Sequence, residues 1–273
     1  MNISFTKMHG LGNDFIVIDG RKRKLPEMAK AAKLLCDRRL GVGADQLLLL
    51  EPSKKADVQM QIYNADGSQV EMCGNGIRCV AQYVSNHGSG EQEVRVETIA
   101  GVQTVRILGD GQIQVNMGRA ILKGEEIPVK LKGRIINHPL RIHGIEYRMT
   151  CVSMGNPHCV LFIDNLKEYP VHEKGPLIEN YYLFPNRTNV EFVKVISKKK
   201  IEMRVWERGA GETLACGSGA CAAAVASHLN GKTERKVEVK LPGGTLEIEW
   251  NRAEDSVYMT GPATTVFEGK IEL

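Results

Sequence analysis

The sequence is poor in aromatic residues, carries little net charge and contains no long apolar run. Only 5% of its 273 residues are aromatic, and none alternate with basic residues as a base-stacking surface requires. The formal net charge is +4, so we expect no nucleic-acid partner. No stretch approaches the roughly 20 apolar residues of a membrane span, and the first ten residues lack the apolar core of a signal peptide. We therefore expect a cytoplasmic protein with no membrane partner.

The remaining composition is typical of a folded chain with more than one core. Hydrophobic residues make up 42% and charged residues 25%, and a length of 273 residues favours two domains over one. The seven cysteines are an odd number, and in a chain expected to stay in the cytoplasm they are predicted to be reduced thiols.

The two halves of the chain are similar at one fixed offset of 143 residues. Matched positions that carry the same residues include Gly12-Asn13 with Gly155-Asn156, Cys73-Gly74 with Cys216-Gly217, and Gly88 with Gly231. Because one offset holds along both halves, duplication of a single unit is the simplest explanation. We therefore predict two homologous domains, residues 1–118 plus 264–273 and residues 119–263.

Each half is predicted to be an α/β unit in which a curved, mostly antiparallel sheet surrounds a central apolar helix. The two helices follow Cys73 and Cys216 and end at Gly88 and Gly231. In the first half, mostly alternating apolar runs between glycine or aspartate turns predict strands at residues 14–19, 46–51, 58–64, 94–98, 103–108 and 112–117.

Three further segments complete the predicted fold. Apolar residues at helical spacing predict a weaker helix that opens at Pro26 and runs toward Arg39. Residues 119–143 are expected to join the two halves, and residues 266–273 are expected to form a strand that packs on the first half.

A Cys-Gly-x-Gly motif begins each predicted central helix, as Cys73-Gly-Asn-Gly76 and as Cys216-Gly-Ser-Gly219. Backbone N–H groups at a helix N-terminus lack partners and the helix dipole is positive there, which favours a bound carboxylate and a thiolate. The glycines let an anion approach the backbone closely. One such motif in each half predicts inversion of a carbon acid, in which one thiolate removes a proton and the opposite thiol delivers one.

A zinc site is the alternative interpretation of these cysteines. It would use Cys73 with Cys79, which are separated by five residues, and Cys216 with Cys221, which are separated by four. Structural zinc sites commonly have about two to four residues between paired cysteines. On a helix these spacings also direct the paired sulfurs to different faces. We therefore expect no metal site, and we interpret the other cysteines as packing residues: Cys36, Cys79, Cys151, Cys159 and Cys221.

Polar residues recur at matched positions where a core would not place them. Asn13 and Asn156 begin apolar strands, Asn64 and Glu207 end matching strands, and Gln46 aligns with Asn189. A turn or cap is the ordinary role of an isolated Asn, but paired amides fit a hydrogen-bonding cage for ammonium and carboxylate groups. His158 and Glu207 align with the non-ionisable Phe15 and Asn64, so they are candidates to adjust the protonation of the thiols.

Together these motifs resemble the diaminopimelate epimerase family, and the resemblance runs along the whole chain. It rests on His9-Gly-Leu-Gly-Asn-Asp-Phe15, Asn64-Ala-Asp-Gly-Ser68, Cys73-Gly-Asn-Gly-Ile-Arg-Cys79, Gly155-Asn-Pro-His158, Trp206-Glu-Arg-Gly-Ala-Gly-Glu-Thr213 and Ala215-Cys-Gly-Ser-Gly-Ala220. The resemblance implies a cofactor-independent interconversion of L,L- and meso-diaminopimelate, which supplies lysine and peptidoglycan precursors. It also implies a small amino-acid substrate bound in a cleft between pseudo-symmetric halves, and a homodimer.

The resemblance also implies roles for individual residues. Cys73 and Cys216 are expected to be the acid-base pair, with His158 and Glu207 as modulators of their protonation. The expected substrate contacts are Asn13, Gln46, Asn64, Gly74, Asn75, Asn156, Asn189, Glu207, Arg208, Gly217 and Ser218.

Two other functions remain as alternatives. One is a related two-base racemase or isomerase with a proline-like or aromatic substrate, against which residues 206–220 and Arg208 argue. The other is a metal or redox protein with reduced thiols. Arg208 is interpreted as the cation for a second substrate carboxylate, the alternative being a structural ion pair with a nearby acid.

Overall fold

The fold consists of two compact units. The computed structural model describes residues 2–22, 25–71, 73–88 and 90–272. Contacts divide the chain into a first unit, Met1–Asn116 with Thr260–Leu273, and a second unit, Met117–Met259.

The two units share one order of helices and strands, to which each unit adds one further strand described below. The first runs β1 (Asn2–Gly10), β2 (Asn13–Asp19), α1 (Met28–Leu35), β3 (Gln46–Glu51), β4 (Val58–Asn64), β5 (Gln69–Val70), α2 (Gly74–His87), β6 (Glu93–Thr98), β7 (Gly101–Ile107) and β8 (Ile113–Asn116). The second runs β10 (Ile145–Ser153), β11 (Pro157–Phe162), α3 (Val171–Glu179), β12 (Asn189–Ser197), β13 (Lys200–Glu207), β14 (Gly211–Thr213), α4 (Gly217–Leu229), β15 (Lys236–Leu241), β16 (Gly244–Asn251) and β17 (Ser256–Gly261). The offset of 143 residues therefore matches elements as well as motifs.

Strand pairing repeats at the same offset. Phe15 pairs with Gln46 where β2 and β3 run parallel, and His158 pairs with Asn189 where β11 and β12 run parallel. The strands β4 and β6 are also parallel, as are β13 and β15. Most of the other strand pairs are antiparallel, so the predicted mostly antiparallel α/β fold is confirmed. The parallel pairs occur where a helix between two strands serves as a crossover.

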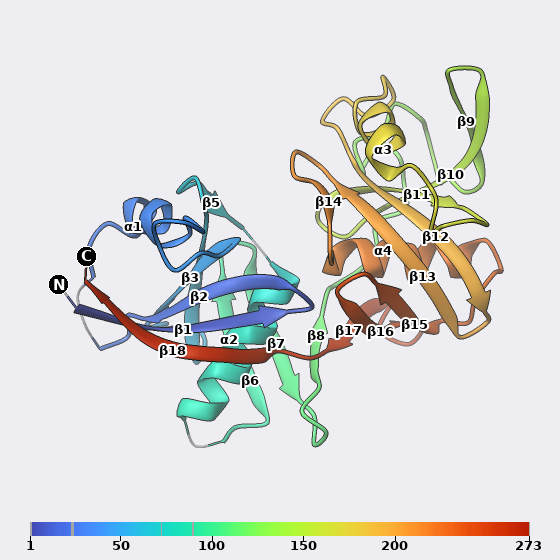
Figure 1. The fold of residues 1–273 in the computed structure, drawn as a ribbon. Helices are drawn as coiled ribbons and strands as arrows, with labels where there is room; N and C mark the ends of the chain where they lie inside the picture. The colour runs from blue at the N-terminus through green and yellow to red at the C-terminus, as the bar shows by residue number, and fades with distance from the viewer. Residues whose placement is uncertain (1, 23–24, 72, 89, 273) are drawn as a thin grey trace. The chain divides into compact units, whose positions relative to one another are not determined.

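In each unit two helices pack on opposite faces of the same central strand. Leu47 and Leu49 of β3 lie in one apolar cluster with α1, whereas Leu48 lies beside Gly76 in the first turn of α2. Successive strand residues face opposite sides of a sheet, so α1 and α2 occupy different faces. The helix α2 contacts β1, β6, β7 and β8, and lies among the strands of its unit in Figure 1.

The central helix of the second unit is buried on nearly every side. Its residues from Gly219 to Ser227 are all buried, and six of the nine are alanine or valine. The predicted helices after Cys73 and Cys216 are confirmed as α2 and α4, although α4 ends at Leu229, two residues before Gly231.

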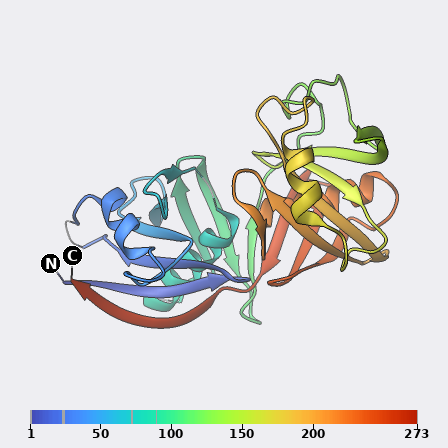
Figure 2. The same cartoon turned by 45° about the horizontal axis from the view of Figure 1, so that its top comes forward.

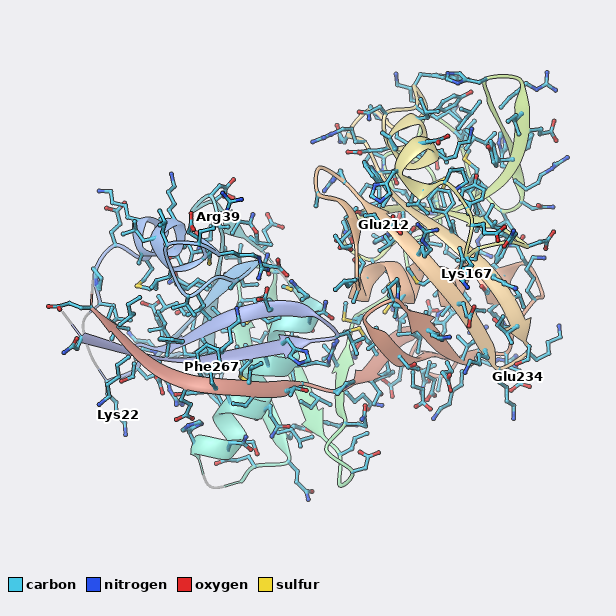
Figure 3. The ribbon with its side chains drawn as sticks, viewed as in Figure 1. Lys22, Arg39, Lys167, Glu212, Glu234 and Phe267 are labelled. Atoms are coloured by element: carbon cyan, nitrogen blue, oxygen red, sulfur yellow. The ribbon has the colours of Figure 1, made fainter. Side chains whose placement is uncertain are left out.

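The strand predicted at residues 266–273 is confirmed as β18 (Thr264–Glu272), which pairs antiparallel with β1; residue 273 lies outside the described residues. Figure 2 shows this pairing along the length of both strands, red beside blue. Phe267, labelled in Figure 3, lies on β18 with its ring edge to face with Phe5. The sequence did not predict β1, since its apolar residues share the strand with serine, threonine, lysine and histidine.

Two predicted segments differ from the structure. The first helix covers only Met28–Leu35, because the Asp37 side chain accepts hydrogen bonds from the N–H groups of Arg39 and Leu40 and forms a turn there. Residues 119–143 are more than a connection. They contain β9 (His138–Ile142), which pairs with β10, and they add Ile127, Val129 and Ile135 to the core of the second unit.

Among the described residues, no helix combines the length and the apolar character that crossing a membrane requires.

Candidate active site

In the first unit, Cys73 is the N-cap of α2 and lies beside two asparagines. Its Sγ accepts a hydrogen bond from the N–H of Gly76 at 3.4 Å and lies 3.7 Å from Oδ1 of Asn13. The same Oδ1 accepts from Nδ2 of Asn75 at 3.3 Å. Three residues expected at the site, Asn13, Cys73 and Asn75, are therefore neighbours, and the thiol is half-buried at a helix N-terminus.

A network of charged residues holds Asn13 in place. Nδ2 of Asn13 donates to Asp45 at 2.9 Å, and Arg38 donates to both Asp45 and Asp14 at 2.7 Å. Burial acts to raise the pKa of Asp14, but hydrogen bonds from Arg38 and Lys7 outweigh it and hold that pKa well below its usual value. No local pattern in the sequence predicts this network, because Asp45 lies 32 residues from Asn13.

Gln46 and Asn64 form a second amide pair in the first unit. They are directly opposite in the β3–β4 pairing, and Nε2 of Gln46 donates to Oδ1 of Asn64 at 2.9 Å. Nδ2 of Asn64 donates to Ser68 Oγ at 2.9 Å. Oε1 of Gln46 is buried and has no hydrogen-bond partner among the described residues.

In the second unit, Cys216 is the N-cap of α4 and is buried. Its Sγ lies 3.6 Å from Oγ of Ser218. Burial raises the pKa of the Cys216 thiol well above its ordinary value, and the carboxylates of Glu207 and Glu191 raise it further. Hydrogen bonds from Ser218 and from the N–H of Gly219 act in the opposite direction. The surroundings of Cys216 therefore favour the thiol over the thiolate.

His158 is fully buried between Asn156 and an acid that the sequence analysis did not single out. Its Nδ1 lies 2.7 Å from Oε1 of Glu191, and its Nε2 lies 2.9 Å from Oδ1 of Asn156. The pKa of the Glu191 carboxyl is raised overall, because burial and the nearby charge of Glu207 outweigh the charge of His158 and the hydrogen bond from it, which lower that pKa. The signal in the sequence was that Glu191 aligns with Leu48 at the same offset that aligns His158 with Phe15.

Asn189 supports the turn that carries Arg208. Its Nδ2 donates to the carbonyl of Pro157 and its Oδ1 accepts from the N–H of Arg208, both at 2.9 Å. The Arg208 side chain is exposed and donates to the carbonyl of Asn186 at 3.2 Å. It forms no ion pair within residues 2–22, 25–71, 73–88 and 90–272, so the structure does not support the alternative of a structural ion pair.

Glu207 and Glu179 both accept hydrogen bonds in or next to this turn. Glu207 accepts a hydrogen bond from Oγ1 of Thr213 on the neighbouring strand β14. Glu179 is buried and accepts from Nε1 of Trp206 at 2.7 Å and from the N–H of Gly209 at 3.0 Å. The structure therefore anchors the backbone before and after Arg208 while it leaves the guanidinium exposed.

The remaining cysteines lie in the apolar interior. Burial raises the pKa of Cys79 to about 12 and that of Cys36 to about 11. Cys151, Cys159 and Cys221 are buried as well. In the part of the chain that the structure describes, no three His, Cys, Asp or Glu side chains are grouped so that they could hold a metal ion.

Comparison with known proteins identifies relatives along almost the whole chain. The model of the diaminopimelate epimerase family matches residues 5–123 and 150–266. The chain is 49% identical to the diaminopimelate epimerase of Moorella thermoacetica, with 98% of this chain and 99% of that protein aligned. It is 51% identical to the enzyme of the same name from Carboxydothermus hydrogenoformans, again with 98% and 99% aligned.

Solved structures share the fold at low sequence identity. A phenazine biosynthesis protein of the PhzF family from Bacillus anthracis superposes with a TM-score of 0.73 at 16% identity, and the match covers 100% of both chains. A probable proline racemase from Agrobacterium radiobacter superposes with a TM-score of 0.72 at 16% identity, covering 99% of this chain and 93% of that one. The family match and the close relatives decide the family: this chain belongs to the diaminopimelate epimerases and is an isomerase.

Proposed function

We propose that this enzyme interconverts L,L- and meso-diaminopimelate without a cofactor, and that Cys73 and Cys216 act on opposite faces of the reacting carbon. One observation carries the proposal: each cysteine is the N-cap of the central helix in its own unit, at matching positions of the repeat. Inversion at Cα needs two acid-base groups of similar character, one for each face, and a duplicated motif provides them.

In the proposed mechanism, one thiolate removes the α-proton and the other thiol delivers a proton to the opposite face. Negative charge develops on the α-carboxylate as the proton leaves. The helix dipole and the N–H groups at the start of α2 and α4, including those of Gly74, Asn75, Gly217 and Ser218, would stabilise that charge. After one turnover the two sulfurs have exchanged protonation states, and this allows the reverse reaction from the other isomer.

The surroundings of the two sulfurs suggest which one carries the proton in the free enzyme. Two carboxylates act on Cys216 and raise its pKa. In the first unit, the position that corresponds to Glu191 is Leu48, and the one that corresponds to Glu207 is Asn64. We therefore assign the resting thiol to Cys216.

The amides described above are the proposed substrate contacts. Asn13, Gln46, Asn64, Asn75, Asn156 and Asn189 provide neutral donors and acceptors, and Arg208 provides a cation for the distal carboxylate. From the family resemblance we also propose a homodimer in the cytoplasm, and light scattering after size-exclusion chromatography would test the dimer.

Incubation of the purified enzyme with L,L-diaminopimelate in D₂O is expected to produce the meso isomer with deuterium at Cα. The product's new hydrogen comes from a solvent-exchanged thiol, so label should enter with each inversion. NMR and mass spectrometry measure both events, after removal of metal ions and without added pyridoxal phosphate. Dependence of turnover on added metal or pyridoxal phosphate, or inversion without deuterium incorporation, would contradict the two-base proposal.

Glu207→Gln is expected to shift the limb of the pH–rate profile that reports Cys216 toward lower pH. Glu207 raises the pKa of that thiol, so loss of its negative charge makes the thiolate easier to form. Glu202→Gln is a matched control, since Glu202 lies on the same strand β13 but is paired with Lys240. A raised KM with an unchanged pH profile would assign Glu207 to substrate binding alone.

A further inference from the structure

Two matched buried positions near the N-termini of α2 and α4 differ in chemistry between the two units. In the second unit this pair is His158 and Glu191, joined at 2.7 Å, and both side chains are fully buried. In the first unit the same two positions are Phe15 and Leu48, also fully buried. The strand register is equivalent in both units, so a buried acid-base pair in one unit replaces an apolar pair in the other.

Stability does not explain the presence of this buried pair. Taking two ionisable groups out of water is costly, and well-packed apolar residues at such positions are often as stable or more stable. The first unit shows that Phe and Leu at these positions are compatible with this arrangement of strands and helix. A function in the second unit is the remaining explanation for His158 and Glu191.

The Glu191 carboxylate lies next to the first turn of α4. A Cβ built on Gly219 would be 2.8 Å from Oε1 of Glu191 and 3.3 Å from Sγ of Cys216. The carboxylate oxygen of Glu191 and the sulfur of Cys216 therefore both lie close to Gly219. Gly219 has no side chain, and this leaves room for the carboxylate to approach the turn that carries the thiol. A Cβ built on the corresponding Gly76 would be 3.3 Å from the side chain of Leu48.

We propose that Glu191 is a positioning residue, which fixes the His158 ring and places a buried negative charge beside Cys216. This inference rests on the proposed two-base function. A carboxylate only accepts hydrogen bonds, so Glu191 keeps a proton on Nδ1 of His158. Nε2 is then directed at Asn156, whose amide can accept from it or donate to it. Oε2 of Glu191 is buried and has no hydrogen-bond partner among the described residues, so its charge is poorly screened.

The electrostatic effect on Cys216 has a defined direction. Two carboxylates act on this thiol, Glu191 from β12 and Glu207 from β13. Ser218 and the N–H of Gly219 act on it from α4 itself. His158 from β11 contacts Glu191. A nearby negative charge disfavours the thiolate. Glu191 therefore helps to hold the proton on Cys216 that the second step of the reaction delivers.

The test is the pH dependence of kcat and kcat/KM for Glu191→Gln, which removes the charge but keeps the size. We expect kcat to fall by roughly tenfold or more, because the ring and the thiol lose their preferred protonation states. The limb that reports Cys216 should move to lower pH by about one pH unit, and KM should change much less. Glu202→Gln, a glutamate of β13 paired with Lys240, should keep both the rate and the profile of the parent enzyme.

A second variant separates positioning from folding. His158→Phe combined with Glu191→Leu copies the apolar pair of the first unit, so we expect a melting temperature within a few degrees of the parent enzyme and a kcat lowered at least as far as in Glu191→Gln. If the His158–Glu191 pair only supported the fold, this double variant would retain the parent kcat. A parent-like kcat and pH profile in Glu191→Gln would also overturn the proposal. Deuterium exchange by the unmodified enzyme tests the proposed function separately from either result.

Discussion

Replacing Cys73 or Cys216 by serine is expected to lower kcat for epimerisation by about 10²- to 10⁴-fold, the range typical for loss of a general acid or base. A serine hydroxyl is a much weaker acid than a thiol, so it can neither hold a resting anion at neutral pH nor deliver a proton rapidly. Because inversion needs a group on each face, the two variants should show losses of similar size. Epimerisation assays with both diaminopimelate isomers measure the effect.

The two variants should still differ in one respect. Each variant retains one catalytic cysteine. It should still exchange the α-proton of the isomer whose α-proton faces that cysteine, with little conversion to the other isomer. Deuterium incorporation without inversion would reveal this half-reaction. The matched controls are Cys79→Ala and Cys221→Ala, which alter buried cysteines of the same two helices. Near-normal turnover in either serine variant would exclude that cysteine from the acid-base pair.

Arg208→Met is expected to lower kcat/KM for diaminopimelate by roughly 10- to 150-fold. This corresponds to the loss of one charge-assisted hydrogen-bonded contact, about 1.5–3 kcal/mol. Two helix N-termini already serve the reacting carboxylate in the proposed site, so an additional cation needs a second carboxylate as its partner. A guanidinium can bind that group through two parallel hydrogen bonds. The exposed Arg208 side chain, which has no ion-pair partner in the described part of the chain, is available for this contact.

Lysine distinguishes substrate recognition from a structural role of Arg208. Lysine keeps the distal amine but lacks the distal carboxylate, so the parent enzyme should convert it very slowly. Arg208→Met should hardly change that residual rate. Arg141→Met, which removes an exposed arginine from β9, should leave both substrates and the melting temperature nearly unchanged. Equal losses on both substrates together with a lower melting temperature would show that Arg208 supports the fold.

The amino-acid sequence by itself determined the repeat, the class of fold and the central helices. The offset of 143 residues, the alternating apolar strands and the two Cys-Gly-x-Gly motifs are local patterns, and each is visible within a short window or by comparing two windows. The apolar residues that follow each motif, and the glycine that ends each apolar run, predict a helix after each cysteine. Cys73 and Cys216 are therefore expected as the N-caps of these helices.

The tertiary structure alone decided which side chains meet. Glu191 contacts His158 across 33 residues, and Asp45 contacts Asn13 across 32. These contacts depend on the parallel register of β2 with β3 and of β11 with β12, and on which face of the strand each residue occupies. Shifting a strand by one residue moves every side chain to the other face, so no local pattern specifies these partners. Packing of the whole unit selects the register, and with it the buried carboxylate that lies beside Cys216.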